Sequence, residues 1–433
     1  MSVYDEINQI NNLKTVVLEL CKRISILENN ILKPDDYSMA VDTNDNFHPI
    51  RIQSRRKLNT NIYNSTNDSD TSVIVSGENC VINDSSTNLS SIISGKANTI
   101  TKSDNSNIIG GSGNTIDSGV HNIIGGGIGN NIDTSSEYSE ILNGTGNTIE
   151  KGEYSLIASG ENNNIQNSLY SFIGSGESNE ITNTSISSVI SGGLQNDINH
   201  SENSFIGSGE QNKIISSNDS FIGGGDSNKI NNTPYGFIGN GDDNNIEASS
   251  KHSCIVNGNS NYISNSINSF IGSGGVNKIT SSKISFIGGG NSNTISTDSD
   301  NSVISGGNNN KIDDSQYSII SGGKHNNINT KSHYSSIIGG TDNTISNSSQ
   351  YTSIINGNSN TIDLYSDTYP KTYIGYDCNL KDKYDNPNIF SVRPKMVNSM
   401  PNLKNALSIS VDTSNNEIYL WLGETLCCSG NYV

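Results

Sequence analysis

The chain has 433 residues, only 31% of them hydrophobic, and its 43 acidic and 25 basic residues give a formal net charge of −18. This negative charge argues against nucleic acid or an anionic membrane as a partner, because both would repel the chain at long range. Such a composition is compatible with disorder, but the scarce Ile, Val and Phe residues recur at fixed intervals, which indicates an ordered repeat.

Residues 1–33 predict an α-helical coiled coil that joins several chains. Its a and d positions carry, apart from Glu6, the aliphatic residues Val3, Ile10, Leu13, Val17, Leu20, Ile24, Leu27 and Ile31. Branched residues at a with Leu at d favour a dimer. The segment "RISILE", however, resembles the trimerisation signature of short coiled coils, in which Arg23 and Glu28 would pair between chains. We expect three chains.

The start of the sequence and its hydropathy bear on location. No apolar run approaches the length of a membrane span, and "MSVYDEINQINN" lacks the basic and apolar blocks of a secretory signal. We therefore expect assembly in a cytoplasm without secretion or membrane insertion.

The next segment, residues 34–72, holds Arg51, Arg55, Arg56 and Lys57. It is interpreted as an adapter, with a basic dock onto an acidic particle component as the alternative.

Residues 73–365 are built from one repeat. The pattern G-x-x-N-x-I occurs eighteen times between Gly77 and Gly357 at intervals of 16, 17 or 18 residues, and its Asn is missing only at Cys80. Each unit has two short apolar pieces separated by Gly-, Asn- and Ser-rich turns, which predicts two strands per unit. The fold class is therefore all-β, a parallel β-solenoid (β-roll or β-helix) of about 18 coils, closed by a degenerate copy around Gly375. The recurring Asn is expected to pass amide hydrogen bonds from coil to coil.

The two strands of the repeat differ. The middle residue of N-x-I varies freely, as at Lys213 and Lys229, so one face of that strand meets water. The other strand has adjacent apolar residues, such as Phe205 and Ile206, so it is apolar on both faces. One face is expected to fill the interior of the solenoid, and the other to pack against something outside it. Six phenylalanines align four residues before their glycine, namely Phe172, Phe205, Phe221, Phe237, Phe270 and Phe286. They indicate either an aromatic ligand groove or subunit packing in an intertwined or side-by-side homotrimer; packing is favoured.

Repeats of the form S-x-I-I-G-G-x-x-N-x-I resemble those of the trimeric β-roll heads of autotransporter adhesins and of related viral and phage fibres, over about residues 73 to 380. The Asn-rich style also resembles surface fibres of giant DNA viruses. Autotransporters carry a secretion signal, a neck motif and a C-terminal membrane barrel, and none of these is recognisable in this sequence. The resemblance therefore favours a virion fibre over a bacterial adhesin.

Residues 366–433 change character and predict a small C-terminal β tip or cap. "LSISVDTSNNEIYLWLG" predicts two alternating strands around a turn at residues 414–416. Tyr419 and Trp421 share one face of the second strand, where they either fill the core of the tip or contact a receptor, and packing of Trp421 in the trimer core is favoured. The adjacent Cys427 and Cys428 have no assigned role.

Enzyme chemistry has weak support in the sequence. Among the carboxylates at the position after the repeat glycine, Glu161 and Glu177 lie on neighbouring coils, and Glu210, Asp226 and Asp242 lie on three successive coils. Neighbouring coils would bring such groups together, as in glycoside hydrolysis or Ca²⁺ binding. A turn open to water, however, offers nothing to raise the pKa of one carboxyl. No catalytic, metal-binding or cofactor-binding residue is assigned.

These observations lead us to expect a non-enzymatic, homotrimeric structural fibre on the surface of a virus particle, assembled in the host cytoplasm. Its expected partners are its own copies, other virion surface proteins and a host receptor or glycan. The alternatives are the head of a cell-surface adhesin and a tailspike-like enzyme that degrades polysaccharide.

Overall fold

The computed structural model describes strands at residues 38–41, 47–50 and 65–67, then residues 72–83, 89–133 and 135–363, and finally strands at 371–375, 379–380, 389–393, 407–412, 417–422 and 425–431. The chain divides into two compact units, residues 1–61 and 62–433. No helix occurs among the described residues. The predicted coiled coil of residues 1–33, with all of its packing residues, lies outside them.

In the first unit, β1 (Ser38–Val41) and β2 (Phe47–Ile50) pair antiparallel, with Val41 opposite Phe47. The sequence pattern does not predict this hairpin, because its strands are short and β2 contains Pro49. Both strands of a two-stranded sheet are edge strands, where a proline can be accommodated.

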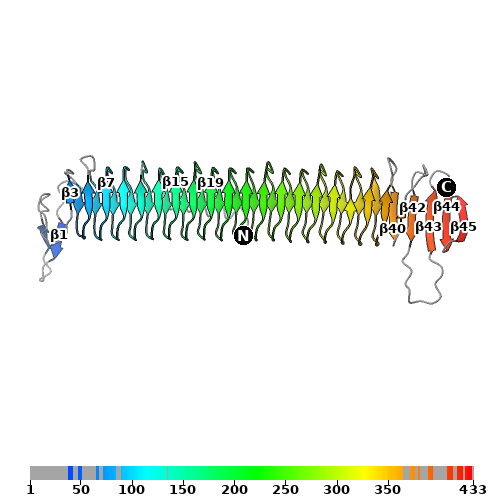
Figure 1. Ribbon diagram of the computed structural model, residues 1–433. Helices are drawn as coiled ribbons and strands as arrows, with labels where there is room; N and C mark the ends of the chain where they lie inside the picture. The colour runs from blue at the N-terminus through cyan, green and yellow to red at the C-terminus, as the bar shows by residue number, and fades with distance from the viewer. Residues whose placement is uncertain are drawn as a thin grey trace. The chain divides into compact units, whose positions relative to one another are not determined.

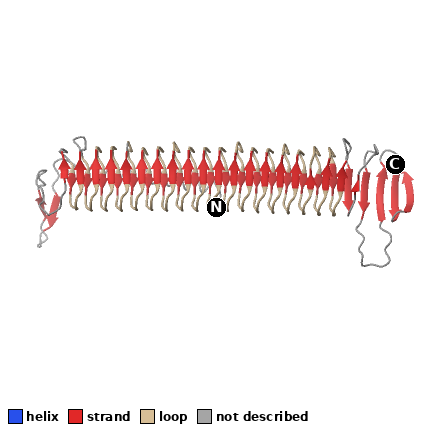
Figure 2. Cartoon of the chain, in the orientation of Figure 1, coloured by secondary structure: helices blue, strands red, loops and turns tan. Residues whose placement is uncertain are grey.

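The second unit is a parallel β-solenoid, which confirms the predicted all-β repeat fold (Figure 1, Figure 2). Each coil adds one strand to each of two parallel sheets, and neighbouring strands pair in register, as Phe205 does with Phe221 and Lys213 with Lys229. The first sheet, called the even sheet, contains β4 (Val73–Ile74), β6 (Ser91–Ile92), β8 (Asn107–Ile108), β10 (Ile123–Ile124), β12 (Glu140–Ile141), β14 (Leu156–Ile157), β16 (Phe172–Ile173), β18 (Val189–Ile190), β20 (Phe205–Ile206), β22 (Phe221–Ile222), β24 (Phe237–Ile238), β26 (Cys254–Ile255), β28 (Phe270–Ile271), β30 (Phe286–Ile287), β32 (Val303–Ile304), β34 (Ile319–Ile320), β36 (Ser336–Ile337) and β38 (Thr352–Ile354).

The second sheet, called the odd sheet, is formed by the N-x-I strands and begins one strand earlier. It contains β3 (Ser65–Asn67), β5 (Val81–Asn83), β7 (Thr99–Thr101), β9 (Thr115–Asp117), β11 (Asn131–Asp133), β13 (Thr148–Glu150), β15 (Asn164–Gln166), β17 (Glu180–Thr182), β19 (Asp197–Asn199), β21 (Lys213–Ile215), β23 (Lys229–Asn231), β25 (Asn245–Glu247), β27 (Tyr262–Ser264), β29 (Lys278–Thr280), β31 (Thr294–Ser296), β33 (Lys311–Asp313), β35 (Asn327–Ile328), β37 (Thr344–Ser346) and β39 (Thr361–Asp363).

A third ladder, called the single-residue ladder, runs between the two sheets. The repeat pattern does not predict it. The residue after the turn glycine forms a single parallel bridge to its equivalent in the next coil, as Glu210 does with Asp226. One residue per coil leaves no hydrophobic alternation in the sequence, so this ladder has no strand signature.

The interior of the solenoid is mostly polar. In one representative coil the inward residues are Ser204, Ile206, Asn212, Ile214 and Ser217, each with an exposed fraction of 1% or less. Only two of these five columns are aliphatic, which explains how a chain with few hydrophobic residues folds. The serines are satisfied by the next coil: the hydroxyl of Ser204 donates to the carbonyl of Ser217 and accepts from the backbone N–H of Ser220. Buried polar groups paired in this way avoid the cost of desolvation.

One coil shows how tightly the serine columns are packed. Gly119 and Asn122 replace the usual two serines, and the side-chain amide of Asn122 donates to the carbonyl of Ser136 at 2.6 Å. A Cβ added at Gly119 would overlap both that amide and that carbonyl. The larger Asn122 therefore fits because residue 119 has no side chain.

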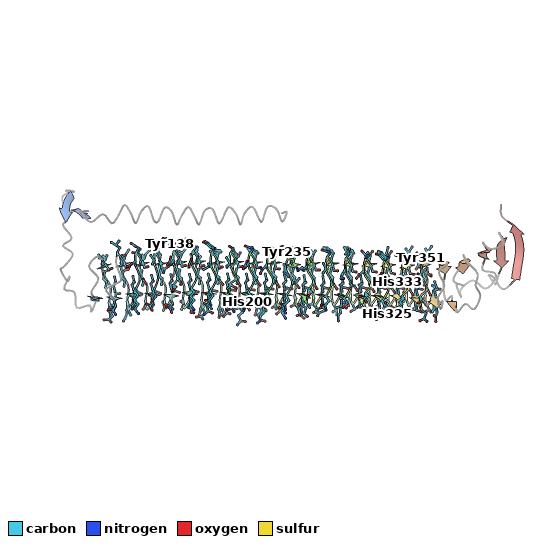
Figure 3. The ribbon with its side chains drawn as sticks, turned by 90° about the horizontal axis from the view of Figure 1, so that it is seen from above. Tyr138, His200, Tyr235, His325, His333 and Tyr351 are labelled. Carbon is cyan, nitrogen blue, oxygen red and sulfur yellow. The ribbon has the colours of Figure 1, made fainter. Side chains whose placement is uncertain are left out.

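The turns hold many residues in the left-handed region, which accounts for the abundance of Asn and Ser. In one coil Gln211, Ser216 and Asp219 have φ of 55°, 49° and 56°. Coils of 17 residues have a second such residue after the odd strand, as at Ala248 and Ser249, so the extra residue is absorbed there. The turns line both edges of the solenoid, and Figure 3 shows Tyr138, Tyr235 and Tyr351 along one edge and His325 along the other.

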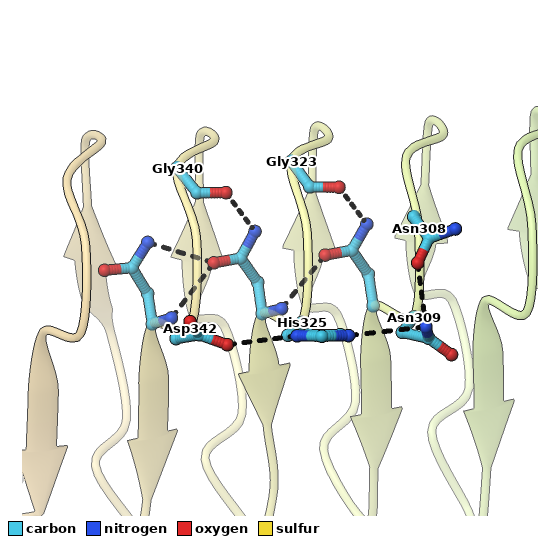
Figure 4. Close-up of polar contacts among 9 residues, drawn as sticks. Asn308, Asn309, Gly323, His325, Gly340 and Asp342 are labelled. Atoms are coloured by element: carbon cyan, nitrogen blue, oxygen red, sulfur yellow. Dashed lines mark hydrogen bonds and ion pairs between the residues drawn. The ribbon is translucent and has the colours of Figure 1, made fainter.

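Glycine and asparagine lock each coil to the next. The amide of Asn212 donates to the side-chain oxygen of Asn196 at 3.1 Å and to the carbonyl of Gly225 at 2.9 Å, and the oxygen of Asn196 also accepts from the backbone N–H of Asn212. This confirms the predicted Asn ladder. Figure 4 shows the carbonyls of Gly323 and Gly340 accepting equivalent bonds.

After the repeats, the even sheet continues. β40 (Lys371–Gly375) and β41 (Asn379–Leu380) pair parallel with β38 and β39, which confirms the degenerate copy around Gly375. β42 (Ile389–Arg393) pairs parallel with β40, and β43 (Leu407–Asp412), β44 (Glu417–Leu422) and β45 (Thr425–Asn431) then add antiparallel. β43 and β44 are the two strands predicted on either side of residues 414–416.

Replacing a turn glycine should damage the stack. Gly209 has φ of +105°, and an added Cβ would overlap the carbonyl oxygen of Gly225 and lie 2.7 Å from the amide nitrogen of Asn212. We expect Gly209→Ala to cost on the order of 2 to 4 kcal/mol, because strain and overlap add. The loss is measured by urea unfolding and by hydrogen exchange of the neighbouring coils.

Gly113 provides the matched control. It also has positive φ, +68°, but no atom lies within 4 Å of an added Cβ, and Asn162 occupies the equivalent position with φ of 55°. Gly113→Asn should therefore stay within about 0.5 kcal/mol of the parent. Equal losses of unfolding free energy in Gly209→Ala and Gly113→Asn would contradict the role assigned to the close contact between the turn glycines of neighbouring coils.

Candidate functional site

The outer face of the even sheet carries an apolar stripe along the solenoid. Two residues per coil point outward there, four and two places before the turn glycine, and their sizes compensate. All six coils with Phe at the first position have Gly at the second, as in Phe172 and Gly174. A Cβ added at Gly174 would lie 3.4 Å from the ring of Phe172, so the ring covers the glycine. Where the first residue is small or polar, as at Ser336, the second is large, as at Ile338.

Every coil thus presents a large apolar side chain on this face. The outer stripe consists of Val73, Ile93, Ile109, Ile123, Leu142, Leu156, Phe172, Val189, Phe205, Phe221, Phe237, Val256, Phe270, Phe286, Val303, Ile319, Ile338 and Ile355. None of them is buried, and Phe286 and Ile338 are 39% and 53% exposed. Glu140 is the only charged residue at either outward position, although the chain has 43 acidic residues. A face with a single charged residue in such a chain is typical of an interface core.

The six phenylalanines singled out in the sequence all lie in this stripe. The rings of Phe205, Phe221 and Phe237 stack at 5.1 and 5.2 Å, and those of Phe270 and Phe286 at 5.1 Å. Cys254 stands in the same column between Phe237 and Phe270, and burial raises the pKa of its thiol to about 11. The thiol is therefore protonated and unreactive at neutral pH.

The five carboxylates considered for catalysis lie in the single-residue ladder. Glu161 neighbours Glu177, and Glu210, Asp226 and Asp242 follow one another in successive coils. All five are exposed. The side chain of Asn259 donates to the carboxylate of Asp242 at 2.7 Å. Among the described residues, no group of three or more His, Cys, Asp or Glu is placed to hold a metal ion.

A second aromatic column, missed in the sequence, follows one turn. Its members stand six places before the turn glycine in three runs of successive coils, namely His121, Tyr138, Tyr154 and Tyr170, then Tyr235 and His252, then Tyr317, Tyr334 and Tyr351. Adjacent rings are nearly parallel, with centroids 4.6 to 5.1 Å apart. All nine residues have φ between 53° and 60°, a conformation that side chains of this size rarely adopt. The fixed distance from the turn glycine is visible in the sequence, but non-aromatic residues such as Ser187 and Ile284 interrupt the column.

A block of charges on the odd sheet was also missed. Glu180, Asp197, Lys213 and Lys229 occupy the variable N-x-I position in four successive coils. Burial, and then the neighbouring Glu180, raise the pKa of Asp197 to about 6, while Lys213 acts against this shift. Within its own repeat, each of these residues indicates only that one face of the strand meets water, and the block is visible only when neighbouring coils are compared.

The other predicted site residues are placed only in part. Tyr419 and Trp421 lie in β44, and Cys427 and Cys428 in β45. The trimerisation residues Val3 to Ile31, including Arg23 and Glu28, lie outside the described residues. Within the described part of the chain, no helix is long and apolar enough to cross a membrane.

Comparison with protein-family models gives no match for this chain, and comparison with curated protein sequences gives none either. The functional argument therefore rests on the surfaces of the solenoid itself.

The raised pKa of Asp197 predicts a pH-dependent stability. The folded chain holds the Asp197 proton more tightly than the unfolded chain, so the free energy of unfolding falls as pH rises from about 4 to about 6, and the loss persists above that. Asn occupies this position in other coils, as at Asn245. Asp197→Asn should therefore stabilise the chain at pH 7 by on the order of 1 to 3 kcal/mol, with little effect at pH 4. Urea unfolding at both pH values measures this.

Asp313→Asn is the control of opposite sign. Burial raises the pKa of Asp313, but hydrogen bonds from Ser296, Lys311 and Thr297 outweigh it and lower the pKa. That carboxylate stabilises the fold above its unfolded-state pKa, and the contribution is lost as pH falls through the folded value. Asp313→Asn should therefore destabilise at pH 7. A loss of stability at pH 7 in Asp197→Asn would contradict the assignment.

Proposed function

We propose that this chain is a non-enzymatic structural fibre protein of a virus particle, built as a homotrimer, that attaches the particle to a host surface. The resemblance of its repeats to those of trimeric β-roll heads and viral fibres supports this proposal, as does the long regular stack of coils. Its other proposed partners are neighbouring proteins of the virion surface.

The outer stripe is the observation that carries the proposal. At about 4.8 Å per coil, eighteen coils extend it over about 86 Å. A surface with the same axial spacing covers such a stripe best, and another copy of the chain has that spacing in every coil. Two residues across a strand give a width of about 7 Å, so a pair of such faces buries on the order of 1,200 Å², the lower end of the range for stable interfaces.

Three copies are favoured over two by the "RISILE" segment, in which Arg23 and Glu28 match the trimer signature. A coiled coil at one end and an apolar stripe along the shaft would then require the same partners. The stripe would keep the chains together where the coiled coil does not reach.

Recognition is assigned to the tip, residues 366–433, including Tyr419 and Trp421. A solenoid presents the same geometry about every 4.8 Å and suits length and stiffness. Specific recognition commonly uses irregular loops and aromatic anchors. Three tips on one fibre would add avidity to weak individual contacts.

One observation favours a second candidate, hydrolysis of a polysaccharide. Glu180 and Asp197 are neighbouring carboxyls, and the raised pKa of Asp197 is what a general acid needs. This candidate predicts that reducing sugar ends are released from a host polysaccharide and that Asp197→Asn abolishes the release. The fibre proposal predicts no release.

Immunogold electron microscopy tests the fibre proposal. Virus particles from the source of this sequence are labelled with antibodies against residues 366–433 and, separately, against residues 73–365. We expect both labels on particle-bound rods, with the first at the distal ends. Label restricted to cell envelopes would support the adhesin alternative, and unlabelled particles would contradict the proposal.

A further inference from the structure

The order of the charges in the charge block, Glu180, Asp197, Lys213 and Lys229, lowers the stability of the odd sheet. In-register pairing sets Glu180 beside Asp197 and Lys213 beside Lys229, so like charges are neighbours at two of the three steps. Like charges directly opposite each other destabilise a sheet, and alternating signs would have been favourable at every step. An arrangement that costs stability on a regular scaffold points to a function.

This block stands apart from the rest of its column. The other described strands of the odd sheet from β5 to β39 have no acidic residue at this position, and their lysines, Lys278 and Lys311, have Tyr, Thr or Asn neighbours. Two adjacent lysines beside two adjacent carboxyls therefore occur once among these strands. General solubility would not require such a cluster.

The block lines a groove of about 570 Å³ that runs across four coils. The groove is also lined by Asn196 and by the turn residues two places before each charged residue, namely Ser178, Gln195, Gln211 and Ser227. The amide of Gln211 donates to the side-chain oxygen of Gln195 at 3.2 Å.

Several groups in the groove have unused capacity. The Oδ1 atom of Asp197 is buried without a hydrogen-bond partner, as are the Oδ1 atoms of Asn245 and Asn327 at the same position of other coils, but only Asp197 lines the groove. Lys213 forms no ion pair with any residue in the described part of the chain, and Lys229 reaches Glu247 only at 3.9 Å. The groove therefore offers an anion site beside hydrogen-bond acceptors and amide groups.

We propose that this groove binds an oligosaccharide that carries a carboxylate, with the sugar acid at Lys213 and Lys229 and neighbouring hydroxyl groups at Asp197, Gln195 and Gln211. A sugar acid supplies one negative charge for the lysines. Its hydroxyl groups can donate hydrogen bonds to the carboxylates of Glu180 and Asp197. Inorganic phosphate carries more charge on a smaller body and cannot reach both the lysines and the carboxylates, and a polyanion would be repelled by both carboxylates. Three coil spacings of about 4.8 Å give the groove room for more than one sugar ring.

This inference extends the proposed attachment function and gives the shaft a contact of its own beside the tip. The groove lies on the odd sheet, whereas the outer stripe lies on the even sheet. Chains that associate through the stripe therefore do not need to cover the groove. Binding is measured on the isolated full-length chain, so its failure is distinguishable from failure of the virion assignment.

The test is calorimetric titration of the full-length chain with four probes: an aldobiouronic acid (one glucuronic acid linked to one neutral sugar), 3′-sialyllactose, neutral lactose and inorganic phosphate. We expect at least one acidic saccharide to bind and lactose and phosphate to bind at least tenfold more weakly. The difference between the aldobiouronic acid and 3′-sialyllactose, each with one carboxylate, identifies a uronic acid or a sialic acid as the ligand class.

Variants locate the site. The double variant Lys213→Gln and Lys229→Gln should weaken binding of the acidic saccharide at least tenfold, whereas Lys278→Gln, in the same column three coils away, should leave it unchanged. Circular dichroism melting checks that all variants are folded. The proposal is overturned if neither acidic saccharide binds at millimolar concentration, if lactose binds equally well, or if Lys278→Gln weakens binding as much as the double variant.

Discussion

The close approach of one coil to the next at the turn glycine is the constraint on which the rest of the solenoid depends. With no side chain at Gly209, the carbonyl of Gly225 comes within reach of the amide of Asn212, which also bonds to Asn196. The contact recurs along the stack and holds successive coils in register. Register in turn places every other side chain in a column, whether buried, apolar or charged.

That register explains how so polar a chain folds and why its surface is patterned. A buried Asn or Ser is costly alone, but in a column each one is satisfied by the coil beside it. The same stacking turns a single outward residue into a stripe. A preference that is weak in one repeat, such as an apolar outward residue in place of a charged one, becomes a continuous surface when the repeats share it.

Much of the fold could be predicted from the sequence because its determinants are single residues repeated at one position. The role of a residue such as Ile206, Asn212 or Phe205 can be predicted from a single repeat. The regular period then extends that prediction to the equivalent positions of the other coils. The Tyr column and the charge block could not be predicted from single repeats. The stacking of Tyr154 and the charge environment of Asp197 both depend on which residues occupy the same position in the adjacent coils. The single-residue ladder through Glu210 has no alternation to detect, and the β1 hairpin lies outside the repeat.

The central claim is that the outer stripe is an interface between copies of the chain. Sedimentation equilibrium of the purified full-length protein at micromolar concentration tests it most directly. The account predicts a mass near three times 46.3 kDa, reduced when Phe205 and Phe221 are both replaced by Ser in a variant that remains folded. A parent protein that sediments as a monomer of 46.3 kDa would contradict the account.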